Sequence, residues 1–427
     1  MDRDYLEPAR GVLRIILIAL VTGSVSASAV FLFDLSLDAV YRLTAAPIGT
    51  SRLLIPVAGA LAVGLLILRK VPEAGGEGIP SYIASVDFAE GRMDLAATIL
   101  KFPATVITLG FLGSGGTVGP LARIGGGLGS LLTGVTRLSP AEGPGAGMRT
   151  GAVCGVSGAV AAIFHSPLGG ALFAAEILRR ESMRYSDLFS ALLSGSVSYS
   201  VYSFVLGGEP FFLFPSPAPA LSGYDAIWLP FVAILAGATG MVFIFSYERA
   251  WAAFRHMRGG RPSRALAAGL LLSAALWLSG GWAHGISREY AARLSAGDFS
   301  GPSSFPFFET DIVMALLVFI ALKILLTTVT VGSGLSGGFT GPLLLIGASA
   351  GAMTALMAGA PAGSSTYYSL MACGISATLS ATLNIPLGAI VLTMSLFGSN
   401  YVLPAAAGGS IAFLIFKNRT VYRYYGG

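Results

Sequence analysis

Three short segments place a cluster of glycines directly before a proline and an apolar stretch. They occupy residues 75–80, 116–120 and 337–342. Proline favours the first turn of a helix, where its missing N–H needs no partner, so each segment predicts a flexible turn followed by a helix N-terminus. Backbone N–H groups and the positive end of the helix dipole attract anions without the strong binding of a Lys or Arg. If the three turns share one space, they form an anion site.

The chain also contains an internal repeat. The segment CGVSG that begins at Cys154 returns as CGISA at Cys373, and the turns that end at Pro120 and Pro342 are separated by nearly the same interval. Both cysteines lie in apolar stretches and are interpreted as packing residues rather than as a disulfide. In an apolar chain, two similar halves packed face to face predict a transport site between them, near the bilayer midplane.

The composition describes a chain whose solvent is mostly lipid. Of its 427 residues, 54% are hydrophobic and 11% are charged, and the mean hydropathy is +0.76. The 57 glycines allow helices to approach closely and to break where a site is lined. Many apolar runs are shorter than the ~20 residues that a straight span needs. We therefore predict an all-α polytopic protein of broken and tilted helices, with the lipid bilayer as its surroundings.

The distribution of charge predicts the topology of the chain. Basic residues gather in four segments: 3–14, 179–184, 248–264 and 417–423. By the positive-inside rule, both termini face the cytoplasm from the cell (inner) membrane, and residues 287–311 lie on the opposite side. This topology accounts for the formal charge of +5, and no basic-aromatic alternation indicates a nucleic-acid partner. The apolar run at 12–35 is too long for a cleaved signal, so we expect it to be retained.

A change of composition separates the two halves. Residues 209–224 are rich in Pro, Phe and Ser and are interpreted as a linker. Residues 1–208 and 225–427 are then the two repeat units of a single membrane domain.

Taken in order, these motifs resemble those of the CLC family of chloride channels and chloride/proton exchangers. Residues 72–80, PEAGGEGIP, are similar to the family's first filter motif, residues 116–126 to its second and residues 337–342 to its third. The segment at Val421 and Tyr422 is similar to the one that carries the family's pore tyrosine. The resemblance covers nearly the whole membrane domain.

The resemblance implies a fold, an assembly and a set of site residues. It implies the CLC fold of two inverted-topology repeats, and a homodimer with one anion pathway per subunit and an interface of late helices from each half. With the sequence ending at Gly427, we expect no cytoplasmic nucleotide-binding tail of the kind that some relatives carry. No cofactor and no metal are expected. The residues implied at the pathway are Gly76, Glu77, Gly78, Ile79, Pro80, Thr117, Val118, Gly119, Pro120, Gly338, Phe339, Thr340, Gly341 and Tyr422.

Two positions depart from the family pattern by lacking a carboxylate. Val118 stands where the second motif normally carries a glutamate, which acts as gate and outer proton acceptor. Ile177, next to Glu176, stands at the internal proton-transfer glutamate of the exchangers. Neither replacement has a titratable side chain, so the proton route of the exchangers is expected to be absent.

A third departure places a carboxylate at the filter. Glu77 replaces a serine whose hydroxyl faces the central chloride in many relatives. A fixed negative charge there is costly, so Glu77 should be protonated, turned toward a helix N-terminus in place of an anion, or pointed away toward a structural partner. We prefer the hypothesis that Glu77 has taken over gating or proton sensing, which leaves Glu77 and Val118 as gate candidates.

The roles of three neighbouring side chains stay open. Thr340 stands where relatives usually carry an aromatic residue, and its hydroxyl adds a donor. Arg123, little more than one helical turn from Val118, either raises the local anion concentration or serves as a structural counterion. The phenol of Tyr422 either donates to a central anion or lies at the membrane interface.

Two other classes of function are weighed against anion transport. The sequence GVSG around Ser157 resembles the nucleophile motif of intramembrane serine proteases, with His165 as the base. The repeat pairs Ser157 with Ser376. It pairs His165 with Asn384, so the serine turn is a duplicated packing element without a duplicated base, and we expect no enzyme. A cation pathway, which Glu77 alone suggests, conflicts with the polarity of helix N-termini.

The sequence therefore predicts selective, passive anion conduction that is uncoupled from protons, with chloride as the default ion. The alternative is a proton-linked anion exchanger that uses Glu77. Nitrate, bicarbonate and fluoride suit the same cage of N–H groups and hydroxyls, so the choice of ion stays open.

Overall fold

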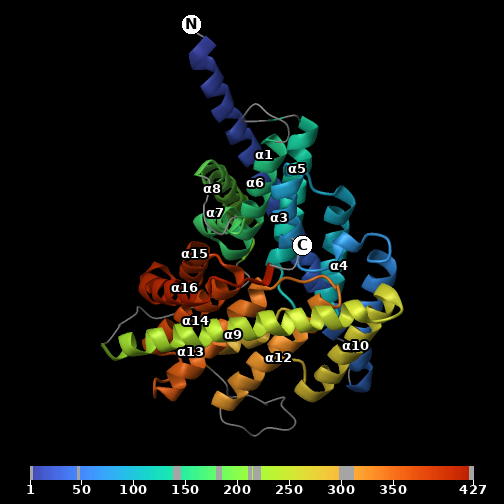
Figure 1. Ribbon diagram of the computed structural model, residues 1–427, viewed down its shortest axis with the longest axis vertical. Helices are drawn as coiled ribbons and strands as arrows, with labels where there is room; N and C mark the ends of the chain where they lie inside the picture. Colours follow the sequence, from blue (N-terminus) through green and yellow to red (C-terminus); the bar gives the residue numbers. More distant parts are fainter. Residues whose placement is uncertain are drawn as a thin grey trace.

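Helices account for nearly all the regular structure of the chain, which Figure 1 shows as a computed structural model. The structure describes residues 3–45, 49–136, 138, 146–178, 185–209, 214, 223–297 and 312–422. Within these ranges there are sixteen α-helices and no β-strand. The prediction of an all-α protein is confirmed.

The helices fall into two series of eight. The first series is α1 (Arg3–Ala45), α2 (Leu54–Ala62), α3 (Ile79–Phe88), α4 (Leu95–Gly110), α5 (Val118–Thr136), α6 (Ala146–Phe164), α7 (Pro167–Glu176) and α8 (Tyr185–Ser200). The second is α9 (Gly223–His256), α10 (Gly260–Ser279), α11 (Arg288–Ala296), α12 (Ile312–Gly332), α13 (Thr340–Met357), α14 (Ser365–Leu383), α15 (Pro386–Phe397) and α16 (Val402–Phe416). The lengths repeat, since α3 and α11 have 10 and 9 residues and α6 and α14 have 19 each.

The chain is a multi-pass membrane protein. Among the described residues, eight helices are long and apolar enough to cross a membrane. Others, such as α3, α7 and α11, have 10, 10 and 9 residues, well short of the ~20 residues of a full span. The predicted mixture of spanning and broken helices is confirmed.

Proline sets where several of the short helices begin. It occupies one of the first two positions of α3, α7 and α15. In α7 the side chain of Ser166 also accepts a hydrogen bond from the Gly169 N–H and so caps the helix start. The helices at the second and third glycine turns begin at Val118 and Thr340, shortly before their prolines.

The same close helix contact occurs once in each half. A Cβ atom on Gly125 of α5 would collide with the carbonyl oxygen of Gly155 of α6, and the reverse is also true. In the second half, Gly347 of α13 and Gly374 of α14 stand in the same mutual relation. Small residues at these positions let the helix backbones touch, which is how membrane helices gain packing energy without a hydrophobic driving force.

The two halves also bond to each other reciprocally. The hydroxyls of Thr105 and Ser336 share a hydrogen bond at 2.7 Å. The hydroxyls of Thr327 and Ser114, which are the counterparts of Thr105 and Ser336 in the opposite halves, share one at 3.1 Å. Each half therefore holds the turn of the other with the same pair of side chains, as expected for two inverted-topology repeats.

Residues suggested for other roles take part in packing. Both cysteines are free and buried, as predicted. Cys154 donates from Sγ to the carbonyl of Ser190 at 3.4 Å, and Ser157 donates from Oγ to the carbonyl of Ala191 at 2.7 Å. Both bonds join α6 to α8, so the protease alternative is not favoured. The linker predicted at 209–224 lies largely outside the described residues.

Candidate anion-binding site

The three glycine turns of the sequence meet in space. Gly116 and Gly338 exchange two backbone hydrogen bonds, each 2.7 Å long. The first turn joins the third, because Gly76 donates to the carbonyl of Leu335 at 3.2 Å and accepts from the N–H of Gly337 at 3.2 Å. The N-termini of α3, α5 and α13 therefore begin beside one another, although their turns are far apart in the sequence.

The carboxylate of Glu77 lies among these helix starts. Its Oε2 accepts a hydrogen bond from the Ile79 N–H at the start of α3, at 2.7 Å, and the Phe339 backbone before α13 is close enough to interact with the carboxylate. Its Oε1 packs so closely on Gly119 of α5 that a Cβ there would collide with it. The hydroxyl of Tyr422 donates to Oε1 at 3.5 Å. With only 1% of its surface exposed, Glu77 is turned toward the helix N-termini rather than away from them.

A buried lysine holds the first glycine turn from behind. Lys101 of α4 is completely buried, and its Nζ donates to the carbonyls of Gly75 and Gly76 at 2.8 and 2.6 Å. It is also close enough to Glu77 for electrostatic attraction. These two bonds fix the backbone that leads into Glu77 and the start of α3. Sequence reasoning missed Lys101, although a lysine inside an apolar run, repeated in the second half at Lys323, was a usable signal.

The other predicted site residues lie at or beside the helix starts. Val118, the first residue of α5, is 1% exposed and belongs to the hydrophobic core. Thr340, the first residue of α13, is fully buried, and its hydroxyl has no hydrogen-bond partner among the described residues. The ring of Tyr422 lies 6.5 Å from that of Phe339, centroid to centroid. The structure thus brings residues of all three turns and the predicted tyrosine together.

The contacts of Arg123 are those of a structural residue. Its Nη1 donates to the hydroxyl of Thr98 at 2.6 Å and its Nη2 to the carbonyl of Asp94 at 3.3 Å. These bonds tie α5 to the start of α4. Of the two interpretations left open by the sequence, the described contacts support the second.

Glu176, the carboxylate next to Ile177, is engaged at a helix end. Its two oxygens accept from the N–H groups of Leu387 and Gly388 at 3.1 and 2.7 Å, which caps α15 of the other half. Ile177 itself is buried at the end of α7. The carboxylate nearest to Ile177 in the sequence is therefore bonded to the start of α15.

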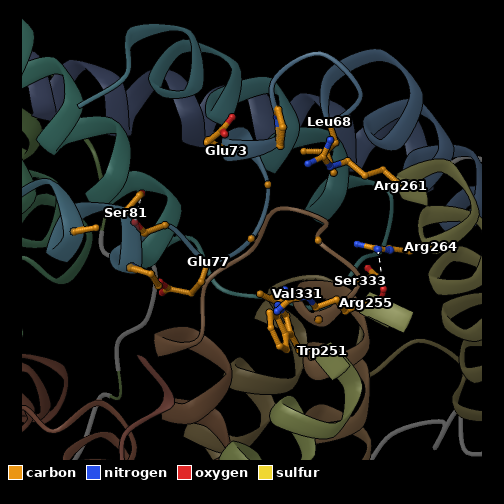
Figure 2. Close-up of a pocket in the computed structure, with 18 residues that line it drawn as sticks. Leu68, Glu73, Glu77, Ser81, Trp251, Arg255, Arg261, Arg264, Val331 and Ser333 are labelled. Atoms are coloured by element: carbon orange, nitrogen blue, oxygen red, sulfur yellow. Dashed lines mark hydrogen bonds between the residues drawn. The ribbon is translucent and has the colours of Figure 1, made fainter. Parts of the chain in front are cut away.

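A cavity of about 460 Å³ reaches the first glycine turn. Glu77 lies at its wall, and three guanidinium groups line it, as Figure 2 shows: those of Arg255, Arg261 and Arg264. Cationic side chains around a cavity raise the local concentration of anions. From the sequence alone, the arginines of residues 248–264 were interpreted only as a signal of membrane topology. Among the described residues, no group of three His, Cys, Asp or Glu side chains is placed to hold a metal ion.

Comparison with known proteins places these features in a family context. The family model described as voltage gated chloride channel matches residues 58–417. The chain is 30% identical over 418 residues to a chloride/fluoride channel protein of Pseudomonas syringae, covering 95% of this chain and 83% of that protein. It is 29% identical over 429 residues to the H(+)/Cl(-) exchange transporter ClcA of Yersinia pseudotuberculosis, covering 94% and 84%. The crystal structure of a CLC-type fluoride/proton antiporter superposes with a TM-score of 0.82 at 21% identity, covering 96% and 97% of the two chains.

We predict that Lys101→Met destabilises the protein by about 2–5 kcal/mol, because it leaves two buried carbonyls and the Glu77 carboxylate without their cation. Thermal unfolding of the detergent-solubilised protein measures the effect. Lys70→Met is the matched control, since Lys70 is exposed and its variant should unfold at the temperature of the parent. Equal unfolding temperatures for both variants would show that Lys101 does not support the turn.

Proposed function

We propose that this chain, which belongs to the family of voltage-gated chloride channels, conducts anions passively through the site between α3, α5 and α13. Members of this family transport anions, and this chain is an anion transporter by its membership. The proposal goes further in three respects: conduction is uncoupled from protons, chloride is the default ion, and Glu77 gates the site.

One observation carries the proposal. The carboxylate of Glu77 is itself an anion, and it accepts hydrogen bonds from the Ile79 N–H at 2.7 Å and the Tyr422 hydroxyl at 3.5 Å, with the Phe339 backbone nearby. Donors placed around one buried point in low dielectric suit a small anion of the same charge. The cavity lined by three arginines supplies anions to this point.

The absence of proton coupling rests on three side chains. Val118 and Ile177 cannot titrate at the two places where the family's exchangers carry glutamates. The adjacent Glu176 is used to cap α15. A proton that crosses together with the anion would therefore lack both of the glutamates that accept it in the family's exchangers.

Glu77 is proposed as the gate because it competes with the permeant anion for the same donors. In its ionised form it fills the cage and holds the pathway closed. Protonation removes the charge that matches the N–H groups, so the carboxyl releases them and an anion can enter.

The second candidate function is proton-linked exchange through Glu77. It is favoured by the same contacts, since a buried carboxylate at the anion site could carry a proton when an anion displaces it. The exchange transporters among the relatives add weight to this alternative.

The assembly and its orientation are proposed together with the function. We propose a homodimer with one pathway per subunit, residues 1–208 and 225–427 as the two repeat units, and both termini in the cytoplasm. The arginines at 248–264 support this orientation by the positive-inside rule. In this proposed orientation the arginine-lined cavity would lie at the cytoplasmic mouth of the pathway.

Reconstitution into liposomes with a chloride gradient tests the proposal. We expect chloride efflux when a potassium ionophore lets K⁺ leave with it and balance its charge. We expect no proton uptake during this efflux. Proton movement in a fixed ratio to chloride, driven against its own gradient and lost in Glu77→Gln, would instead establish the exchanger. No chloride flux above that of protein-free liposomes would contradict both candidates.

Val118→Glu should restore a titratable side chain at the start of α5. We expect chloride flux at neutral pH to fall about tenfold, which corresponds to ~1.4 kcal/mol of competition at the site, and to recover on acidification. Val118→Gln is the control, because it has nearly the same shape without the ionisable group. Flux that is unchanged across the acid range in Val118→Glu would mean that position 118 does not line the pathway.

Glu77→Ser should relieve the competition at the anion site. A carboxylate held by charge-assisted hydrogen bonds worth ~1.5–3 kcal/mol should slow flux by about tenfold or more, so the variant conducts faster at neutral pH. The parent should speed up on acidification, as Glu77 is neutralised, whereas Glu77→Ser and Glu77→Gln should lose this dependence. Identical pH profiles and anion affinities in parent and variants would return Glu77 to a structural role.

A further inference from the structure

An apolar groove of about 670 Å³ runs between α9, α10 and α12. In Figure 1, α9 crosses α12 and meets α10 at its C-terminal end. Nearly all the residues that line the groove are apolar, and its volume lies in the ~300–1,000 Å³ range of small-molecule pockets. The groove is separate from the anion cavity, and the same part of α9 stands between the two: Trp251 and Arg255 line the cavity, whereas Ala250 and Ala253 line the groove.

The walls of the groove lie on the outer surface of the helix bundle. Leu271 of α10 and Leu325 of α12 line it and keep 51% and 54% of their surfaces exposed. All three helices are long and apolar enough to span a membrane. The medium around spanning helices is hydrocarbon, so an extended acyl chain is the apolar occupant that is always present at such a wall.

One cation stands at the rim of the groove. Arg249 is exposed and lines it, with its guanidinium carbon 4.0 Å from the centre of the Phe245 ring. Stacking on an aromatic ring fixes the guanidinium without neutralising it. None of the ion pairs among the described residues includes Arg249. The arginine-rich turn between α9 and α10 follows shortly after it, so this end of the groove is positive.

We propose that the groove between α9, α10 and α12 binds an anionic phospholipid, with an acyl chain along the apolar wall and the phosphate on Arg249. The basic group at the end of the groove would bind the phosphate of such a lipid, and the apolar wall between the spanning helices would bind its acyl chain. A zwitterionic lipid would fill the wall equally well but gain less from Arg249. The site does not depend on the proposed gating by Glu77, because none of the pathway residues lines it.

Native mass spectrometry of the delipidated full chain tests the proposal, using phosphatidylglycerol and phosphatidylcholine with identical acyl chains. We expect each chain to retain one phosphatidylglycerol at concentrations where phosphatidylcholine is lost. Arg249→Gln should weaken the binding of phosphatidylglycerol about fivefold, the effect of one Arg near an anionic headgroup, and leave that of phosphatidylcholine unchanged. Ala253→Trp, at an exposed position of the wall, should weaken both.

Arg258→Gln is the matched control, because Arg258 is exposed on the same basic turn but lines neither the groove nor the cavity. It should bind both lipids as the parent does. Equal binding of the two lipids by the parent, or equal loss in Arg249→Gln and Arg258→Gln, would overturn the proposal. Dissociation of an oligomer in Ala253→Trp would also overturn it, because the groove would then hold a second copy of the chain.

Discussion

The two backbone hydrogen bonds between Gly116 and Gly338 fix where α5 and α13 begin. The two glycines hold equivalent places in the repeat, so each half donates and accepts the same bond across the axis that relates them. The contact admits no side chain, since a Cβ on Gly338 would lie 2.9 Å from the Gly119 nitrogen. Hydrocarbon offers no acceptor to the first N–H groups of a helix. The N–H groups of two helix starts held together inside a membrane therefore need an acceptor, which can be an anion, a water molecule or a protein carboxylate. The need for this acceptor is the physical basis of the candidate site.

The sequence predicted the helix starts well because proline and glycine act locally. The position of Pro80 is enough to predict the beginning of α3, whatever surrounds it. The direction of Glu77 was beyond such reasoning, because one of its donors is the hydroxyl of Tyr422, in the other half of the chain. The partners of Arg123, Thr98 and the Asp94 carbonyl, could not be predicted either, because they are 25 and 29 residues away in the sequence. The sequence marks Lys101 as a lysine inside an apolar run, but it does not identify its partners, because these are backbone carbonyls.

The two buried lysines show how far the symmetry of the halves extends. Lys323 of α12 donates to the carbonyls of Ala283 and Gly285 at 3.1 and 3.0 Å, much as Lys101 does in the first half. Gly285 also accepts from the N–H of Gly115 at 3.4 Å, as Gly76 does from that of Gly337. Each lysine thus secures a loop before a short helix, and each loop bonds to the filter turn of the opposite half. Gly76 and Gly285 are structural equivalents on this basis.

The symmetry of the two halves breaks at the residue that follows Gly76 and Gly285. The residue after Gly285 is Ile286, where the first half has Glu77, and the Ile286 N–H donates to the Tyr41 hydroxyl at 3.2 Å. The short helix that follows begins with Arg288, which pairs with Asp34 and with Asp38 on α1. Side chains of α1 therefore bond to this loop and to the helix that follows it, and the loop lines a cavity of about 430 Å³. The corresponding place of the first half holds the carboxylate of Glu77. Under the gating proposed above, protonation of this carboxylate would free the donors of the first half for a mobile anion.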